Sequence, residues 1–260
     1  MRIIVCVKQV PNTDEVKIDP VKGTLIREGV PSILNPDDAN ALEAALKIKD
    51  EFGARVTVLS MGPKQAAFAL KECLAMGADD ALLLCDRAFA GGDTWATSNT
   101  LAAAIKALGG ADLILAGSQA IDGDTAQVGP QIAAKLDIPQ ITFAIELQLK
   151  DSKISAKRQT QTGYELIEAP LPALLTATRD LNVPRHMNAA LLINATETEV
   201  PVWGLKDINI SEDETGLKAS PTRVIKSFVP PLKAKGKIVS DISAVIKELK
   251  AKRLIGGVSS

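Results

Sequence analysis

The stretch DLILAGSQAIDGDTAQVGPQ, residues 112–131, passes from an apolar run through a glycine-rich turn to the start of a helix. This order is typical of a phosphate-binding turn in an α/β fold, because the free N–H groups and the dipole at a helix start attract anions. The turn nevertheless carries Asp122 and Asp124 where phosphates would lie. The stretch therefore predicts one βα unit of a ligand-binding sheet and raises the question of what an acidic turn holds.

Other segments of the first half repeat this strand and helix alternation. The apolar runs lack polar alternation, which indicates parallel strands buried on both faces, and each helical segment ends at a glycine. We expect an open, doubly wound, mostly parallel α/β sheet with right-handed crossovers. The expected strands are Ile3–Val7, Arg55–Leu59, Ala81–Cys85 and Leu113–Ala116, and the expected helices are Asp37–Phe52, Pro63–Met76 and Thr94–Leu108.

The second half changes character. Four runs predict strands of an antiparallel extension, with a hairpin turn at Asp151-Ser152: Ile141–Leu149, Lys153–Gln159, Tyr164–Glu168 and Ala173–Thr178. Residues 179–202 show few regular periods, and an amphipathic helix is expected from about Asp241 to Leu254. We expect an α/β nucleotide-binding domain over residues 1–225 and a C-terminal arm over residues 226–260. The apolar stripe of the last helix favours packing on another chain, and packing on its own domain stays open.

Composition excludes several classes of function. The 260 residues include 30 Lys and Arg against 31 Asp and Glu, a net charge of −1, which argues against a nucleic-acid partner. We expect no membrane insertion, since no apolar run approaches the roughly 18 residues that span a bilayer, and a cytoplasmic location. Three scattered cysteines and the single histidine, His186, predict neither a metal site nor a catalytic side chain from this chain. Redox chemistry would therefore belong to a cofactor.

Five polar or glycine-rich segments would meet beyond the carboxyl ends of the strands, where such sheets bind ligands. Each one alone is better explained as an ordinary βα turn, but together they favour a nucleotide. The segments are Lys8-Gln9, Asn35–Asp38, Ser60–Gly62, Asp86–Asp93 and Gly117–Val128.

The chain resembles the small (beta) subunit of the electron transfer flavoproteins almost from end to end. The similarity rests on the order and spacing of VCVKQVP (5–11), Asn35-Pro36, SMGP (60–63), LAMGAD (74–79), QAID (119–122) and LPALLTATRDLNVPR (171–185). The resemblance implies pairing with a larger alpha subunit that carries FAD, with the C-terminal arm packing on that subunit. It also implies that the crevice holds either a structural AMP or, in the electron-bifurcating members of anaerobes, a second FAD.

Two segments favour FAD over AMP. DGDTAQVGP (122–130) and GDTWATS (92–98) resemble the bifurcating type, as in butyryl- or caffeyl-CoA dehydrogenase or reductase complexes. Gly123 would let the backbone approach a diphosphate, and the amides from Asp124 to Val128 would open the helix. Asp122 and Asp124 should face away, to cap the turn or bind a ribose hydroxyl, and for Asp124 helix capping alone stays open.

The family site carries over residue by residue. The adenosine end would contact Cys6, Asn35, Asp38 and Met61, and the flavin ring would reach Thr94 and Thr97. The pyrophosphate would lie along the turn that contains Gly117, Gln119, Ala120, Asp122, Gly123, Asp124, Thr125, Gln127 and Val128.

The resemblance implies an electron-transfer subunit of an NADH-dependent enoyl-CoA reductase complex. NADH would reduce the FAD of this chain, one electron would go to ferredoxin, and the other would pass through the alpha-subunit FAD to an acyl-CoA dehydrogenase or enoyl-CoA reductase. The family's recognition loop corresponds to HMNAALLINA (186–195), with Met187 and Leu191 as possible anchors, although 191–193 as plain core stays open. Two other functions also stay open: a non-bifurcating carrier that binds AMP, and a nucleotide-sensing module without redox work.

Overall fold

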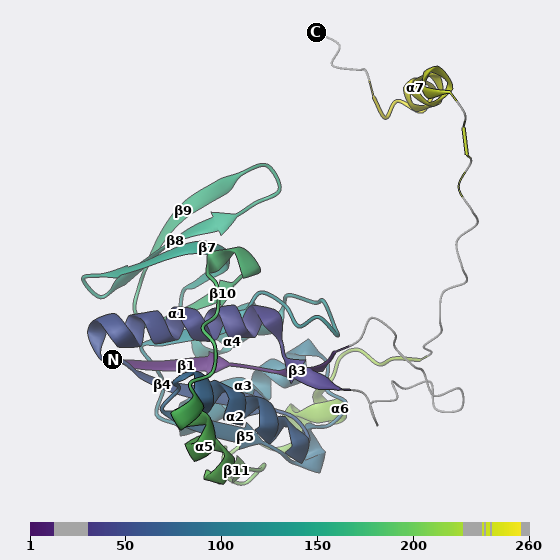
Figure 1. Ribbon diagram of the computed structural model, residues 1–260. Coiled ribbons are helices and arrows are strands. Elements are labelled where there is room, and N and C mark those ends of the chain that lie inside the picture. Colours follow the sequence, from purple (N-terminus) through teal and green to yellow (C-terminus); the bar gives the residue numbers. More distant parts are fainter. Residues whose placement is uncertain (13–30, 226–235, 237, 240, 256–260) are drawn as a thin grey trace. The chain divides into compact units, whose positions relative to one another are not determined.

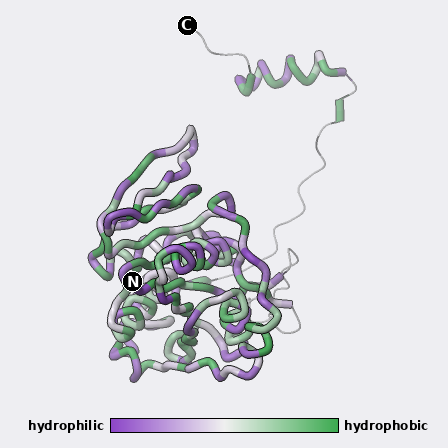
Figure 2. Tube along the Cα trace, turned by 60° about the vertical axis from the view of Figure 1, so that its left-hand side comes forward, coloured by the Kyte–Doolittle hydropathy of each residue, from purple (hydrophilic) through white to green (hydrophobic). Residues whose placement is uncertain are grey.

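The computed structural model describes residues 1–12, 31–225, 236, 238–239 and 241–255 (Figure 1). The described residues belong to two units, one that ends at Ile225 and one that follows it and contains helix α7 (Ile242–Ala251). Helix α7 is capped by Asp241, and hydrophobic and hydrophilic positions alternate along it (Figure 2). Within these described ranges, no helix combines the length and the apolar character needed to cross a membrane.

A nine-stranded sheet forms the centre of the first unit, in the order β11-β5-β4-β1-β6-β10-β7-β8-β9. Its first seven strands pair in parallel, and β8 and β9 add the antiparallel edge that rises in Figure 1. The strands are β1 (Arg2–Cys6), β4 (Arg55–Met61), β5 (Asp80–Leu84), β6 (Leu113–Gly117), β7 (Gln140–Lys150), β8 (Lys153–Gln159), β9 (Tyr164–Pro170), β10 (Ala173–Ala177) and β11 (Val202–Trp203). A separate pair joins β2 (Gln9–Pro11) to β3 (Ser32–Leu34).

Helices cover both faces of the sheet, so the doubly wound α/β fold is confirmed. Ile3 and Val5 of β1 face a core that includes α1 (Pro36–Phe52) and α2 (Ala67–Met76). The alternate residues Ile4 and Cys6 face a second core with α3 (Thr94–Ala107) and α4 (Val128–Leu136). The remaining helices are α5 (Ala189–Glu197), α6 (Gly216–Ala219) and the 3₁₀ turns Lys64–Ala66, Arg87–Phe89, Arg179–Leu181 and Glu212–Glu214.

The structure corrects one expected strand position in the second half of the chain. Residues Ala173–Thr178 were expected in the antiparallel extension, but β10 lies in the middle of the sheet, parallel to β6 and β7. All five of its residues are buried, as a strand covered on both faces requires. Residues 179–202, which show few regular periods, contain α5, whose first turn is capped by the side chain of Asn188. In the first half, the start of the expected helix Pro63–Met76 was wrong, because the 3₁₀ turn Lys64–Ala66 precedes α2.

Candidate functional site

The carboxyl ends of three neighbouring parallel strands meet at one edge of the sheet. Cys6 at the end of β1 is in register with Leu59 of β4 and Ala116 of β6. Met61 and Gly117, the last residues of β4 and β6, therefore lie at the same edge. Burial raises the pKa of the Cys6 thiol to about 12, so this thiol stays protonated and acts as a packing group.

Asp38 in the first turn of α1 joins two of these strand ends. One carboxylate oxygen accepts the backbone N–H of Lys8 at 2.8 Å, and the other accepts that of Gly117 at 2.9 Å. Burial raises the pKa of Asp38 to about 7, against the opposing effect of these hydrogen bonds. Both oxygens of Asp38 therefore have partners inside the protein. The expected contact of Asp38 with adenosine stays a prediction.

Asn35 holds the turn that follows β6. Its side chain is fully buried, donates to the backbone oxygen of Gln119 at 2.9 Å and accepts the N–H of Ile121 at 3.1 Å. The backbone N–H of Asn35 donates to the Lys8 carbonyl at 2.9 Å. Asn35 therefore fixes the path of the backbone around Ala120, and a direct contact with a ligand stays a prediction.

Asp122 forms an ion pair that the sequence did not predict. The Lys8 ammonium lies 2.6 and 2.8 Å from its two carboxylate oxygens. The Lys8 side chain is 44% exposed and that of Asp122 only 12%, so the carboxylate turns inward while the ammonium reaches solvent. Lys8 belongs to a segment that was expected at the crevice, but it was not among the expected ligand-contact residues. Its place directly after a buried strand was the available signal for a role of its own.

The turn between Asp122 and α4 is longer than expected. Helix α4 begins at Val128 with Gln127 as its N-cap residue, so the amides of residues 124–127 precede the helix rather than open it. Asp124 does not cap α4, and its φ of 49° places it in the left-handed region together with Ala126 at 52°. Thr125 lies between them and is exposed.

Gly123 faces open space within this turn. A Cβ atom added at this glycine would find no protein atom within 4 Å. Its own N–H and that of Asp124 both donate to the carbonyl of Ala120, at 3.1 and 2.8 Å, which closes a tight turn. The absence of a side chain here leaves room for a ligand to approach the backbone, and the expected contact with a diphosphate stays a prediction.

The expected ring end is connected to the same turn. Thr94, the first residue of α3, donates its hydroxyl to the side-chain oxygen of Gln127 at 2.8 Å and accepts from the Gln131 amide at 3.3 Å. Thr97, one turn later, is half-buried, and its expected contact with the flavin ring stays a prediction. Trp95, the residue after Thr94, is half exposed, and the Lys135 ammonium lies 3.3 Å from the centre of its ring.

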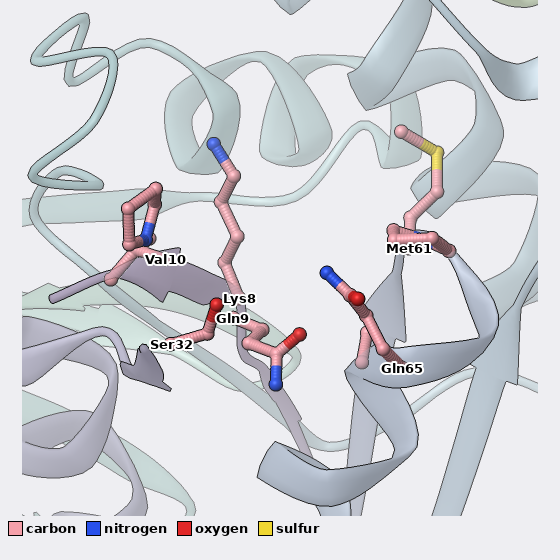
Figure 3. A pocket seen from close by; sticks show the side chains of 10 residues that line it. Lys8, Gln9, Val10, Ser32, Met61 and Gln65 are labelled. Carbon is pink, nitrogen blue, oxygen red and sulfur yellow. The ribbon is translucent and has the colours of Figure 1, made fainter. Parts of the chain in front are cut away.

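A small pocket opens beside Met61, at the end of the crevice where we expect adenosine (Figure 3). Its volume is about 80 Å³, well below the roughly 300 Å³ at which ligand pockets begin, so it can hold only part of a nucleotide. The side chains of Gln9 and Gln65 point toward each other across it. The pocket is lined by Lys8, Gln9, Val10, Pro11, Ser32, Met61, Gly62, Pro63, Gln65 and Ala66. In the described part of the chain, no group of three or more His, Cys, Asp and Glu side chains is arranged to hold a metal ion.

The segment expected to recognise a partner lies on α5 and the residues before it. Arg185 binds the buried Glu43 of α1 through its guanidinium at 2.8 Å and its backbone N–H at 3.0 Å, which fixes the start of this segment. Leu191 is 39% exposed and Ile193 63%, so residues 191–193 are not plain core. Met187 is also exposed.

Comparisons with known proteins agree with this fold. Residues 22–206 match the family model described as the electron transfer flavoprotein domain. The chain is 55% identical to the caffeyl-CoA reductase-Etf complex subunit CarD of Acetobacterium woodii over 262 aligned residues, 98% of this chain and 100% of that protein. It is 55% identical to the electron transfer flavoprotein subunit beta of Clostridium acetobutylicum over 239 residues, 92% of each chain.

The name of a third relative also refers to a reductase. The chain is 48% identical to the acryloyl-CoA reductase electron transfer subunit gamma of Anaerotignum propionicum over 244 residues, 91% of each chain. The chain therefore belongs to the electron transfer flavoprotein family, and within it to the beta-type subunits.

Proposed function

We propose that this chain binds FAD in the crevice at the carboxyl edge of its sheet and works as the beta subunit of an electron-bifurcating electron transfer flavoprotein. NADH would be the hydride donor. Electrons would divide between ferredoxin and the FAD of an alpha subunit, which passes its electron to an acyl-CoA dehydrogenase-type enoyl-CoA reductase. The names of two relatives, which refer to caffeyl-CoA and acryloyl-CoA reductases, support a complex of this class.

The observation that carries the proposal is that the turn after β6 is connected to the start of α3. The open Gly123 leaves the backbone of the turn accessible, and the Thr94–Gln127 hydrogen bond joins the end of that turn to the start of α3. A ligand whose diphosphate lies against residues 123–127 can therefore extend to α3. That extent suits a dinucleotide, whereas AMP would end at the turn.

The residues of this chain would bind and orient rather than react. The N–H groups of Gly123 and Asp124 already donate to the Ala120 carbonyl, so the backbone N–H groups of residues 125–127 would donate to the diphosphate. The hydroxyls of Thr94 and Thr97 would lie toward the ring. Cys6 and Met61 would border the adenosine through the strand ends. Bound FAD would supply the hydride and single-electron chemistry, as flavins do in other proteins.

Two other functions remain candidates. A carrier that binds AMP would use the same strand ends and turn, so the fit of the adenosine half does not separate it from the proposal. A nucleotide-sensing module would use the sheet without electron transfer. The family match favours both flavoprotein functions over the third.

Coupled electron transfer tests the proposal. The complex of this chain with its alpha subunit and reductase is incubated with NADH, oxidised ferredoxin and crotonyl- or caffeyl-CoA. We expect ferredoxin reduction that requires the enoyl-CoA. Reduction of the enoyl-CoA without any requirement for ferredoxin would support the simple carrier, and failure of the chain to pair with any flavoprotein subunit would support the sensing module.

A further inference from the structure

We propose that Lys8 is the electrostatic positioning residue of the nucleotide turn: its ammonium holds and neutralises Asp122, so that an acidic turn can present N–H groups to a phosphate. This inference rests on the proposed nucleotide site and deepens it. It assigns a role to the contact between Lys8 and Asp122, which join segments 114 residues apart in the sequence.

The backbone of Lys8 fixes where its side chain begins. Its N–H donates to Asp38 at 2.8 Å, and its carbonyl accepts the N–H of Asn35 at 2.9 Å. Asp38 and Asn35 also bind the turn itself, at Gly117 and at Gln119. Lys8 is therefore set in the same hydrogen-bonded framework that determines the path of the turn, and the position of its ammonium is not independent of it.

The charge of Asp122 needs such a partner. Asp122 directly precedes Gly123 in the sequence, and the exposed Asp124 follows. A diphosphate would approach the open space at Gly123. A carboxylate and a phosphate about 5 Å apart repel by roughly 3 kcal/mol at the effective dielectric near a protein surface, which corresponds to a loss of about 100-fold in affinity. An ammonium in contact with both carboxylate oxygens removes a large part of that repulsion.

The Lys8 side chain remains partly exposed where it holds Asp122. An ammonium has three N–H donors, and two of its contacts go to the oxygens of Asp122. Because 44% of the side chain remains exposed, the ammonium stays at the mouth of the crevice. Lys8 can thus neutralise Asp122 at the crevice without itself binding the anion.

The chain offers a matched control for the loss of one lysine. Lys49, near the end of α1, lies 2.6 Å from the Asp79 carboxylate, the same distance as in the Lys8–Asp122 pair. Asp79 immediately precedes β5, so this second pair lies at the amino edge of the sheet, opposite the crevice. Lys49→Met removes one charge and one ion pair without touching the proposed site.

The test compares a ligand that carries the diphosphate with one that lacks it. The full-length chain, freed of bound nucleotide, is titrated with ADP and with adenosine by calorimetry, as wild type, Lys8→Met, Lys8→Arg, Asp122→Asn, Lys8→Met/Asp122→Asn and Lys49→Met. We expect Lys8→Met to weaken ADP binding at least about tenfold and to change adenosine binding less than about twofold. Lys8→Arg and Lys49→Met should remain close to wild type.

The double variant distinguishes positioning from a direct phosphate contact. If Lys8 acts through Asp122, then Lys8→Met should cost much less ADP affinity when Asp122 is already Asn. An equal cost in both backgrounds, an equal loss for ADP and adenosine, or unchanged ADP binding in Lys8→Met would each overturn the inference. A wild-type chain that binds neither ligand would contradict the proposed nucleotide site itself, and with it this role of Lys8.

Discussion

The Asp38 carboxylate accepts the backbone N–H of Gly117 at 2.9 Å, and a Cβ atom at Gly117 would overlap the same carboxylate oxygen. The close approach of α1 to the end of β6 therefore depends on the missing side chain. Because the second oxygen of Asp38 binds the N–H of Lys8, the ends of β1 and β6 are joined through one buried carboxylate. This junction forms the base of the crevice.

Gly117→Ala should destabilise the protein by roughly 1–3 kcal/mol, since a methyl group must displace Asp38 or the backbone of α1. The control is Gly123→Ala in the same turn, where the added methyl group meets no protein atom. Urea unfolding of both variants measures the difference. Equal stabilities for the two variants would show that the close approach at Gly117 is not required.

The raised pKa of Asp38 predicts a pH dependence of stability. Between its ordinary value of 3.8 and about 7, the folded state holds a proton that the unfolded state has lost. The contribution of this group is therefore fully present below pH 4, and it is lost as the pH rises to 7, by at most about 1.4 kcal/mol per pH unit. Asp38→Asn, which resembles the protonated carboxyl, should flatten the dependence between pH 5 and 7. Parallel stability curves for wild type and variant would contradict the raised pKa.

Gly123→Val should lower nucleotide occupancy without unfolding the chain. The isopropyl group would fill the space in which we place the diphosphate, and its Cβ atom would meet no protein atom within 4 Å. Gly163→Val is the matched control, because Gly163 also has open space around its Cβ position but lies between β8 and β9. Nucleotide released from the denatured proteins is quantified by chromatography. A full complement in Gly123→Val would rule out this position for the ligand.

The exposed residues at α5 predict a docking effect. Met187→Ser combined with Leu191→Ser should slow electron transfer to the partner reductase at least about tenfold, because apolar anchors carry much of the binding energy at interfaces. Flavin content should not change. Leu166→Ser, on β9, is the control, because this leucine is 79% exposed against 39% for Leu191 and lies away from α5. Wild-type rates in the double variant would place the docking surface elsewhere.

The local pattern of the sequence was sufficient for the parallel core but not for every neighbour. Runs such as Ile3–Val7 are buried on both faces and read as parallel strands, and the structure confirms them within one or two residues. The location of β10 between β6 and β7 depends on pairings across the whole chain, which no local period encodes. Its mostly apolar run, ALLTA, nevertheless fits a central strand better than an edge hairpin.

In the site, too, some features follow from the local sequence and others depend on the tertiary structure. The glycine-rich turn and the carboxyl-edge residues could be predicted, because each follows a buried strand. The pairing of Lys8 with Asp122 could not, since it depends on the three-dimensional register of β1 and β6. Asp38 and Asn35 were expected as ligand contacts, and the structure shows in addition that they organise the turn from inside.

The nucleotide content of the purified complex with the alpha subunit tests the central claim most directly. Nucleotides are released by denaturation, separated, and quantified against the protein concentration. The proposed function predicts two FAD per heterodimer, with one in the crevice of this chain. One FAD together with one AMP per heterodimer would contradict it.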